Sequence, residues 1–506
     1  MQHCGREQSK ASEETSLAKT GQSAYRLVHG STRGLVDVEN FLLTLSRSSE
    51  AHAPFDQEND LFVSRAPGRL DVMGGIADYS GSLVLQLPIQ QAALAAVQPN
   101  HLQSVEIVSL GNSENGRGSS SFSMLLNDLA PEGRPLEYGA AREYFRRNSG
   151  HEWAAYIAGA LLVLMRERDA RCGGIRILLD SHVPEGKGVS SSAAIEVATM
   201  QAICAAFHIK LEPRTLALLC QTVENRVVGA PCGVMDQMTA ASGEQDRLLR
   251  LLCQPADVQG TVEVPHEIAF WGIDSGVRHS VSGSDYTSVR VSAFMGYRII
   301  ADLAGLPVRA NTKTTQVEIC DARWNGYLAN LTPPEFEQYR QQIPERMRGD
   351  EFLARFHGTT DPVTQVDPQR TYTLRQPTAH PVYENFRVGR FAELLLERPG
   401  EAQFEQLGEL MYESHASYSA CGLGSEGTDL LVDLLRARGP KNGLYGAKIT
   451  GGGSGGTVAI LGRREAGRAV HEIAGAYATK TGRNPIVFGH SSPGAAGFGS
   501  LHLTCK

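Results

Sequence analysis

The chain has 506 residues, of which 42% are hydrophobic and 20% are charged, and this composition excludes disorder as its main state. Its 48 Lys and Arg residues against 55 Asp and Glu residues give a net charge of −7, which excludes a broad basic surface for nucleic acid or an anionic membrane. The 53 glycines among 506 residues are a larger share of the chain than the usual share of about 7%. Clustered glycines indicate tight turns or a backbone that approaches a ligand.

The cysteines and the apolar stretches indicate in which cellular compartment the protein is expected. The nine cysteines are scattered and include no Cys-x-x-Cys pair, so the sequence predicts neither a disulfide framework nor a zinc site. The N-terminal stretch is polar and lacks the apolar core of a secretory signal. The longest apolar stretch, Trp153 to Met165, is too short for the roughly 20 residues that span a bilayer. We therefore expect a cytoplasmic protein with no membrane or nucleic-acid partner.

Residues 1–60 are interpreted as an N-terminal extension and linker with one amphipathic helix at Leu35 to Leu45. From residue 61 to residue 265, strand and helix patterns alternate, which predicts a mixed α/β lobe. The elements expected there are strands at 61–64, 105–110 and 174–180, an exposed loop at 111–121, and helices at 153–168, 190–207 and 213–228.

A second lobe is expected over residues 266–506. Its expected elements are strands at 268–274 and 457–461 and helices near 288–303 and 430–438. A Pro-, Arg- and Gln-rich stretch at about 307–381, with short helical pieces such as Pro333 to Arg340, is interpreted as an insertion packed on this second lobe.

The first of three glycine-containing segments runs from Arg65 to Gly81. It leaves a strand, turns at Pro67-Gly68, and presents the polar side chains of Arg69, Asp71, Asp78 and Tyr79. This density of hydrogen-bonding groups suits a polyhydroxylated ligand. A surface turn with solvated charges remains the alternative, because Pro-Gly turns are common.

The second segment, Val183 to Ala194, leads from a strand directly into a helix. Its glycines and serines are Gly186, Gly188, Ser190, Ser191 and Ser192. A loop of this kind offers free backbone N–H groups and the positive end of a helix dipole, which hold phosphates without a basic patch. It is not a Walker loop, because Lys187 precedes a glycine. Three consecutive serines exceed what one N-cap needs, so we favour anion binding, with a hydroxyl available for Mg²⁺.

The third segment, Thr450 to Thr457, is glycine-rich and precedes a strand, whereas a dinucleotide-binding loop follows one. We interpret it as a loop in which two backbones approach closely, with a flexible hinge as the alternative. Between the second and third segments, Glu224 ends a predicted helix and Asp236 follows a Pro/Gly break in an apolar stretch. A carboxylate there is costly unless it is paired or used, so Asp236 is a candidate catalytic residue, with a satisfied helix cap as the alternative.

Together, and in this order, these segments resemble the motifs of the GHMP kinase superfamily, and several of them resemble galactokinases. The galactokinase-like stretches are Arg65 to Arg69, Pro231 to Gln237, Val277 to Ser280, Ser284 to Tyr286 and Met411 to His415. The resemblance implies an α+β, two-lobed GHMP kinase fold with the active site in the cleft between the lobes. It also implies ATP and Mg²⁺ as cofactors, a small monosaccharide as partner, and a monomer or weak homodimer.

The resemblance also assigns residues. It implies that Asp236 accepts the proton of the sugar's anomeric hydroxyl and that Arg69 steadies this aspartate, as phosphoryl transfer requires positioning and charge stabilisation. The loop from Gly186 to Ser192 corresponds to the ATP-phosphate loop, and Ser192 with Glu224 to the Mg²⁺ site. The positions that correspond to sugar contacts are Asp78, Gly233 and Tyr286. The positions of the third motif, which supports the phosphate loop, are Gly452, Gly453 and Ser454, the last in place of a usual aromatic residue.

One departure from galactokinases concerns the choice of sugar. Gly75 and Ile76 stand where galactokinases typically carry Glu-His, beside the C6 hydroxymethyl group. This change removes partners for the hydroxyl and adds apolar bulk, which favours a sugar without C6, such as L-arabinopyranose. The stretch Met73 to Ser82 is similar to the plant L-arabinokinases. The same holds for three stretches near or within the insertion: Arg323 to Tyr327, Asp361 to Thr364 and His380 to Phe386.

The sequence therefore predicts an ATP-dependent sugar 1-kinase that forms L-arabinose 1-phosphate, and the chain resembles only the kinase half of the plant enzymes. A galactokinase is the alternative within the same class. A non-catalytic, galactokinase-like sugar sensor is the alternative from another class, and the intact Arg69, Glu224 and Asp236 argue against it.

Overall fold

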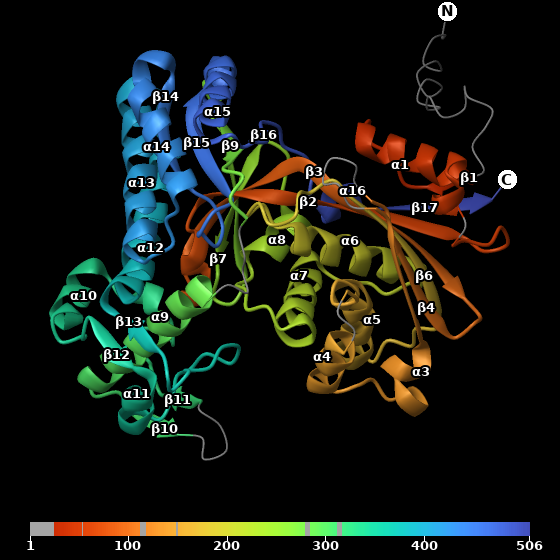
Figure 1. Cartoon of the computed structure of the whole chain (residues 1–506), viewed down its shortest axis with the longest axis horizontal. Coiled ribbons are helices and arrows are strands. Elements are labelled where there is room, and N and C mark those ends of the chain that lie inside the picture. The colour runs from red at the N-terminus through yellow and green to blue at the C-terminus, as the bar shows by residue number, and fades with distance from the viewer. Residues whose placement is uncertain are drawn as a thin grey trace, which may run out of the picture.

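The computed structural model describes residues 25–52, 54–111, 118–147, 150–278, 284–310 and 316–505. Most of the expected loop at 111–121 and part of the galactokinase-like stretch at 277–286 lie outside the described residues. Within the described ranges, two main sheets organise the chain (Figure 1).

The larger sheet has nine strands and follows the order β1-β17-β2-β3-β6-β4-β5, with β7 and β8 joined to β3. Only β4 and β6 run parallel in it, and its other pairs are antiparallel. The strands are β1 (Tyr25–His29), β2 (Leu61–Met73), β3 (Leu83–Asn100), β4 (Ser104–Ser109), β5 (Ser120–Leu125), β6 (Gly174–Ser181), β7 (Arg247–Leu252), β8 (Asp257–Glu263) and β17 (Ser500–Cys505).

Helices cover both faces of the larger sheet. Helix α6 packs on β2 and β3, while α1 lies on the opposite face in Figure 1, where Phe41 contacts the cluster around Val63 and Leu501. The helices of this part are α1 (Val36–Arg47), α2 (Ser49–His52), α3 (Leu126–Leu129), α4 (Tyr138–Arg146), α5 (Ala154–Arg168), α6 (Ser191–Ala206), α7 (Pro213–Thr222), α8 (Met235–Ser242) and α16 (Ala495–Phe498). Helices α5 and α6 are apolar around most of their circumference, so they lie inside the layer of helices.

The smaller sheet has four strands in the order β14-β15-β9-β16, all antiparallel. They are β9 (Ile268–Asp274), β14 (Leu444–Ile449), β15 (Thr457–Arg463) and β16 (Val487–Phe488). Long helices accompany this sheet in Figure 1: α12 (Arg375–Leu395), α13 (Glu401–Ala420), α14 (Glu426–Arg438) and α15 (Gly467–Thr481). Helix α9 (Ser284–Leu303) leads from β9 into the segment that we interpreted as an insertion.

That segment, residues 307–381, forms a compact unit with its own apolar cluster. Its elements are β10 (Val308–Ala310), β11 (Val317–Ile319), α10 (Pro333–Arg340), β12 (Arg346–Arg348), α11 (Gly349–Phe356) and β13 (Thr371–Thr373). Trp324, Phe336 and Phe352 bury their side chains against Tyr297 of α9. Pro381 lies inside α12, so the segment runs into that helix without a break.

The structure confirms the α+β class and most of the expected elements, with three differences. The expected turn at Pro67-Gly68 is wrong, because these residues lie inside β2, at an irregularity in its pairing with β3. The last strand, β17, lies between β1 and β2 in the larger sheet, although we expected residues 500–505 in the second lobe. Residues 25–29, expected in a loose extension, form β1 against β17. Both strands are short and gain their partners only across the whole length of the chain. Our division of the chain at residue 266 stays a prediction, with these strands moved to the larger sheet.

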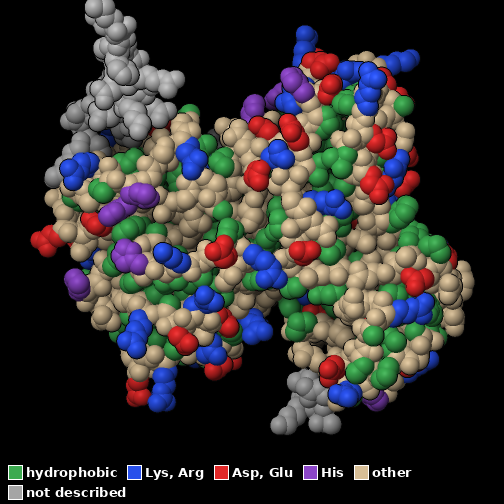
Figure 2. Space-filling view, turned by 180° about the vertical axis from the view of Figure 1, so that it is seen from behind, with side chains coloured by type: hydrophobic (Ala, Val, Ile, Leu, Met, Phe, Trp, Pro, Cys, Tyr) green, Lys and Arg blue, Asp and Glu red, His purple; other side chains and the backbone are tan. Residues whose placement is uncertain are grey.

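The surface carries charges of both signs. On the face shown in Figure 2, Lys and Arg side chains are interspersed with Asp and Glu side chains, in keeping with the net charge of −7. Across the parts of the chain that the structure describes, no helix combines the length and apolar character needed to cross a bilayer.

Candidate active site

A cavity of about 1310 Å³ brings together most of the residues that the motifs predicted. It is bounded mainly by elements of the larger sheet and its helices, and on one side by the glycine-rich loop after β14. The predicted residues that line it are Arg69, Ile76, Asp78, Gly186, Gly188, Ser190, Ser191, Ser192, Glu224, Gly233, Asp236 and Tyr286, together with Gly452. Gly75, Gly453 and Ser454 are not among the lining residues.

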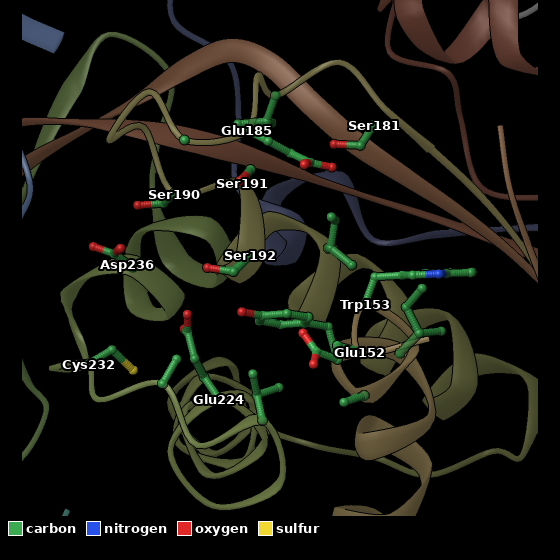
Figure 3. A pocket seen from close by; sticks show the side chains of 18 of the residues that line it. Glu152, Trp153, Ser181, Glu185, Ser190, Ser191, Ser192, Glu224, Cys232 and Asp236 are labelled. Carbon is green, nitrogen blue, oxygen red and sulfur yellow. The ribbon is translucent and has the colours of Figure 1, made fainter. Parts of the chain in front are cut away.

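The loop between β6 and α6 forms one wall of the cavity. Ser190 adopts a left-handed conformation (φ 63°) as the N-cap residue of α6, and its buried Oγ has no hydrogen-bond partner among the residues that the structure describes. In Figure 3 the side chains of Ser190, Ser191 and Ser192 lie around the start of this helix. The first N–H groups of a helix have no partner within it, so this wall presents both amides and hydroxyls to an anion.

Arg69 and Asp236 form a bidentate ion pair beside this loop. Arg69 Nε donates to Asp236 Oδ1 (2.9 Å) and Nη2 donates to Oδ2 (3.0 Å), while Nη1 donates to the Gly188 carbonyl oxygen (2.6 Å). Asp236 lies in the first turn of α8, where the helix dipole favours a negative charge. The guanidinium therefore fixes the carboxylate against the loop between β6 and α6.

Glu224 lies in a π-helical turn, Val223–Val228, that continues α7, a local distortion often found at functional sites. Its carboxylate accepts hydrogen bonds from Gln237 Nε2 (2.6 Å) and Ser192. Burial first, and the negative charge of Asp236 second, raise the pKa of Glu224 to about 7. Ser192, Glu224 and Asp236 present oxygen atoms to a common space in Figure 3.

Glu196, which the motifs did not single out, lies directly behind this space. It is buried on α6, and Gln237 Nε2 donates to its Oε2 (3.2 Å) as well as to Glu224. Burial and the nearby charge of Glu224 raise the pKa of Glu196 well above its ordinary value. A single charged residue in an otherwise uncharged, largely apolar helix was the only sequence signal available for it.

Asp78 marks the other end of the cavity. It is buried in the 3₁₀ turn Gly75–Ser80, and its carboxylate accepts the N–H groups of Tyr79 and Met235. Burial and the charge of Asp236 raise the pKa of Asp78 to about 7. Gly233 makes this close approach possible, because a Cβ there would lie 1.7 Å from Asp78 Oδ2. Asp78 Oδ1 has no partner among the described residues, so it is available to a ligand hydroxyl.

Tyr418 explains why residue 75 is a glycine. Gly75 has a φ of +46°, and a Cβ there would lie 1.5 Å from the Tyr418 hydroxyl oxygen. This hydroxyl accepts a hydrogen bond from the Ile76 N–H (2.9 Å) and donates one to the Gly451 carbonyl oxygen (2.9 Å). The ring of Tyr418 on α13 thus occupies the space of a side chain at residue 75, and the apolar side chain of Ile76 faces the cavity.

A buried ion pair joins the first motif to the third. Lys448 of β14 contacts Asp71 Oδ2 (2.7 Å), and both side chains are inaccessible to solvent. Asp71 also accepts the N–H groups of Gly75 (3.0 Å) and Gly451 (3.4 Å). Gly453 and Ser454 follow on this loop, where the Ser454 N–H donates to the Leu423 carbonyl oxygen (2.7 Å). The third loop therefore supports the first one from behind.

The cavity extends beyond the predicted residues into an apolar end. Leu110, Phe145, Trp153, Tyr156 and Ile195 line this part. They come from β4 and its following loop, α4, α5 and α6, and no short motif connects them in the sequence. Glu152, Glu185 and Arg278 also line the cavity. No group of three or more His, Cys, Asp or Glu residues with the arrangement of a metal site occurs among the described residues.

Comparison with known proteins gives matches to three family models and to a plant relative. Three family models match the chain: the GHMP kinases N terminal domain over residues 155–244, the GHMP kinases C terminal domain over residues 392–479, and the galactokinase galactose-binding signature over residues 52–99. The chain is 43% identical to L-arabinokinase from Arabidopsis thaliana over 98% of its own length and 53% of that protein. It thus spans about half the length of this relative.

More distant similarities concern galactokinases. The chain is 28% identical to a galactokinase from Chloroflexus aggregans, over 84% of this chain and 90% of that protein. The crystal structure of Lactococcus lactis galactokinase complexed with galactose covers 89% of this chain with a TM-score of 0.67 at 19% sequence identity, and 99% of that chain is matched. At this identity the likeness concerns the fold, and it agrees with the fold that the motifs predicted.

Proposed function

The chain belongs to the GHMP kinase superfamily, and from this premise we propose that it transfers the terminal phosphoryl group of ATP to the anomeric hydroxyl of L-arabinose. The products are L-arabinose 1-phosphate and ADP. The observation that carries the proposal is the Arg69–Asp236 ion pair, which lies between a phosphate-type loop at Ser190 and a hydroxyl-binding end at Asp78. The 43% identity to a protein named L-arabinokinase supports the choice of sugar.

Asp236 is the group suited to receive the proton of the attacking hydroxyl. An ionised carboxylate has about four lone-pair sites, so Asp236 keeps acceptor capacity while it holds Arg69 through both oxygens. The guanidinium fixes the direction of the carboxylate and adds positive charge where negative charge develops on the phosphoryl oxygens. Phosphoryl transfer depends mainly on such positioning and charge stabilisation.

The residues around Ser192 fit Mg²⁺ bound together with ATP. Mg²⁺ usually keeps several waters and takes one or two protein oxygens along with substrate phosphates. Glu224 and Ser192 supply a carboxylate and a hydroxyl whose oxygens face the same space as Asp236. The raised pKa of Glu224 reflects burial and the charge of Asp236, and a divalent cation would relieve both effects. Bound there, Mg²⁺ supplies positive charge to the phosphates.

The apolar end of the cavity suits the adenine ring. Trp153, Tyr156 and Phe145 line it together with aliphatic side chains, and a flat aromatic base gains from apolar and stacking contacts. With adenine in the apolar end, the triphosphate of ATP would lie along the loop from Gly186 to Ser192, and the sugar would lie at Asp78.

The sugar end favours a pentose. Gly75 offers no side chain, Tyr418 fills its space, and Ile76 turns an apolar group toward the cavity. L-Arabinopyranose shares the hydroxyl arrangement of galactose at C2 to C4 and lacks C6, so it needs no polar partner beside Ile76. A galactokinase is the second candidate, because the galactose-binding signature matches residues 52–99. An apolar wall rejects an added hydroxyl only moderately, so slower turnover of galactose is expected.

The test is ADP release with L-arabinose, followed by NMR identification of the sugar phosphate. The proposal expects sugar-dependent ADP release and phosphorus coupled to the anomeric proton. The matched control is Asp236→Asn, which retains the shape of the side chain. If wild-type ADP release equals that of Asp236→Asn with every sugar tested, the protein is a non-catalytic sugar binder and the proposal is wrong.

A further inference from the structure

A buried ion pair connects the 307–381 segment to the sugar end of the cavity. Arg290 of α9 donates from Nε to Asp361 Oδ2 (2.8 Å) and from Nη2 to Asp361 Oδ1 (2.8 Å). Asp361 lies in the loop between α11 and β13. Only 4% of Arg290 and 1% of Asp361 is exposed to solvent. A bidentate pair of this kind fixes the plane and position of the guanidinium.

Asp361 is itself firmly held. Its carboxylate accepts the N–H groups of Val363 (3.0 Å) and Thr364 (3.3 Å) and the hydroxyl of Thr364 (2.5 Å). Burial alone would raise the pKa of Asp361, but the hydrogen bonds and charge of Arg290 hold it below its ordinary value. The carboxylate therefore stays ionised and serves as a rigid anchor for Arg290.

Arg290 in turn contacts both segments that form the sugar end, the Cys232–Gly233 backbone and the turn that contains Tyr79. Its Nη1 donates to the Cys232 carbonyl oxygen (3.1 Å), next to Gly233. Its guanidinium lies 5.4 Å from the centre of the Tyr79 ring, and its positive charge opposes the burial that raises the pKa of Asp78. One guanidinium therefore supports the Cys232–Gly233 backbone and faces the turn that carries Asp78.

We propose that Asp361 is a positioning residue for sugar binding: it holds Arg290, and Arg290 sets the distance between the Gly233 backbone and the Asp78 carboxylate. This inference rests on the proposed function and deepens it, because it gives the 307–381 segment a role in recognising the sugar. The close approach of Gly233 and Asp78 leaves no slack, since even a Cβ would overlap the carboxylate. A small displacement of Cys232 therefore reaches the sugar contacts directly.

The same segment offers a matched control. Asp321 also joins it to α9, because the Tyr297 hydroxyl donates to its Oδ2, and it also accepts backbone N–H groups, from Arg323 (2.8 Å) and Trp324 (2.8 Å). Asp321 is not among the described residues that line the cavity, and it accepts hydrogen bonds from Tyr297, Arg323, Trp324 and Gly326. A purely structural role for Asp361 would make Asp361→Asn and Asp321→Asn alike in every measurement except the melting temperature.

The experiment compares Asp361→Asn, Thr364→Val and Asp321→Asn with the wild-type chain. We expect Asp361→Asn to raise the KM for the sugar roughly tenfold, since small misplacements at a reacting site are costly. Its KM for ATP stays within about twofold of wild type, because the phosphate loop keeps its contacts. Thr364→Val, which removes one hydrogen bond to Asp361, shifts the sugar KM in the same direction by less. Asp321→Asn leaves both KM values unchanged.

Hydrogen exchange gives a readout that does not need turnover. In Asp361→Asn, peptides that contain residues 231–238 exchange at least about tenfold faster, while peptides from α6 do not. Asp321→Asn produces no such change at 231–238. A wild-type sugar KM and unchanged exchange in folded Asp361→Asn would overturn the proposal. If wild type phosphorylates no sugar, the proposed function fails, and the exchange comparison still decides whether Asp361 positions residues 231–238.

Discussion

The two ends of the cavity are built by different means, and on the proposed function each would hold its ligand differently. The phosphate end consists of backbone amides and hydroxyls from one continuous loop, Gly186 to Ser192, with Arg69 as a nearby cation. The sugar end depends on buried side chains that come from distant parts of the chain: Asp78, Arg290 and Tyr418. On the proposed function, a chain with a net charge of −7 would hold a triphosphate without a basic surface, because a helix start replaces side-chain charge.

The two ends should tolerate amino-acid substitutions differently. A loop of amides keeps most of its function when one hydroxyl is removed, because each contact contributes little. Buried charged residues support one another, and removal of one partner leaves the other without compensation. We therefore expect substitutions at the sugar end to reduce activity more than substitutions at the phosphate loop. Substitution of Asp236, which lies between the two ends, should have a larger effect than either.

The largest effect is expected for Asp236→Asn, because Asp236 serves both ends. The amide cannot accept the proton of the anomeric hydroxyl, and it pairs weakly with Arg69. We expect kcat to fall roughly 10³-fold while both substrates still bind. Steady-state kinetics and calorimetric binding of the nucleotide measure the two parts. A variant with more than a tenth of wild-type kcat would assign proton acceptance to another group.

Gly233→Ala should be the most severe change at the sugar end. The added Cβ would lie 1.7 Å from Asp78 Oδ2, and overpacking of this kind costs about 1–3 kcal/mol. The KM for the sugar should rise roughly tenfold to a hundredfold, whereas the KM for ATP should change little. Gly475→Ala is the control, because no atom of the described residues outside its own helix backbone lies within 4 Å of a Cβ there. Equal effects of Gly233→Ala on both KM values would mean that the two ends are not separate.

Asp78 should make the sugar end sensitive to pH. Burial and the charge of Asp236 raise its pKa to about 7 against the charge of Arg290, so kcat/KM for the sugar should rise roughly tenfold between about pH 6 and about pH 8. The stability has the opposite sign. A raised pKa in the folded state stabilises the free protein at low pH, and this contribution is lost as the pH rises through about 7.

Asp78→Asn separates these two effects. The variant should lose the rise in kcat/KM and should melt at a higher temperature than wild type at about pH 8, with a smaller difference at about pH 5. Thermal melts at several pH values and initial rates across the same range provide the measurement. A pH profile that survives in Asp78→Asn would attribute the titration to another carboxylate, such as Glu224, whose pKa is also raised to about 7.

The smallest effect is expected at the phosphate loop, for Ser190→Ala. The Ser190 hydroxyl has no partner within the described part of the chain, so the free energy of unfolding should change by less than about 0.5 kcal/mol. The KM for ATP should rise by roughly three- to tenfold, because one hydrogen bond to a charged group is lost. Chemical denaturation and nucleotide titration test the two expectations. An unchanged KM for ATP would remove Ser190 from the phosphate site.

The same contrast explains what the sequence could predict. The phosphate loop, Asp236 and the helices that carry them follow from contiguous motifs and from hydrophobic periodicity, and the structure brings these residues into one cavity. The partners Tyr418, Arg290 and Asp361 could not be predicted, because their contacts join residues up to hundreds of positions apart. Strands β1 and β17 were missed or misplaced for the same reason: they are short, and each depends on the other.

Within the first motif, the glycine at residue 75 was interpreted through the sugar, but its immediate partner is a side chain of the protein. Tyr418 fills the position, fixes the Ile76 N–H, and joins the loop to Gly451. On the proposed function, the choice of sugar at this end would therefore depend on a pair of residues, one local and one distant, and only the local member could be predicted from the motif.

On the proposed function, this sugar end accepts a pentose in place of a hexose. The most direct measurement is kcat/KM for L-arabinose and for D-galactose, determined side by side with the wild-type chain at saturating ATP and Mg²⁺. We predict a higher kcat/KM for L-arabinose, with D-galactose turned over more slowly. A higher kcat/KM for D-galactose would contradict the account and would identify the protein as a galactokinase.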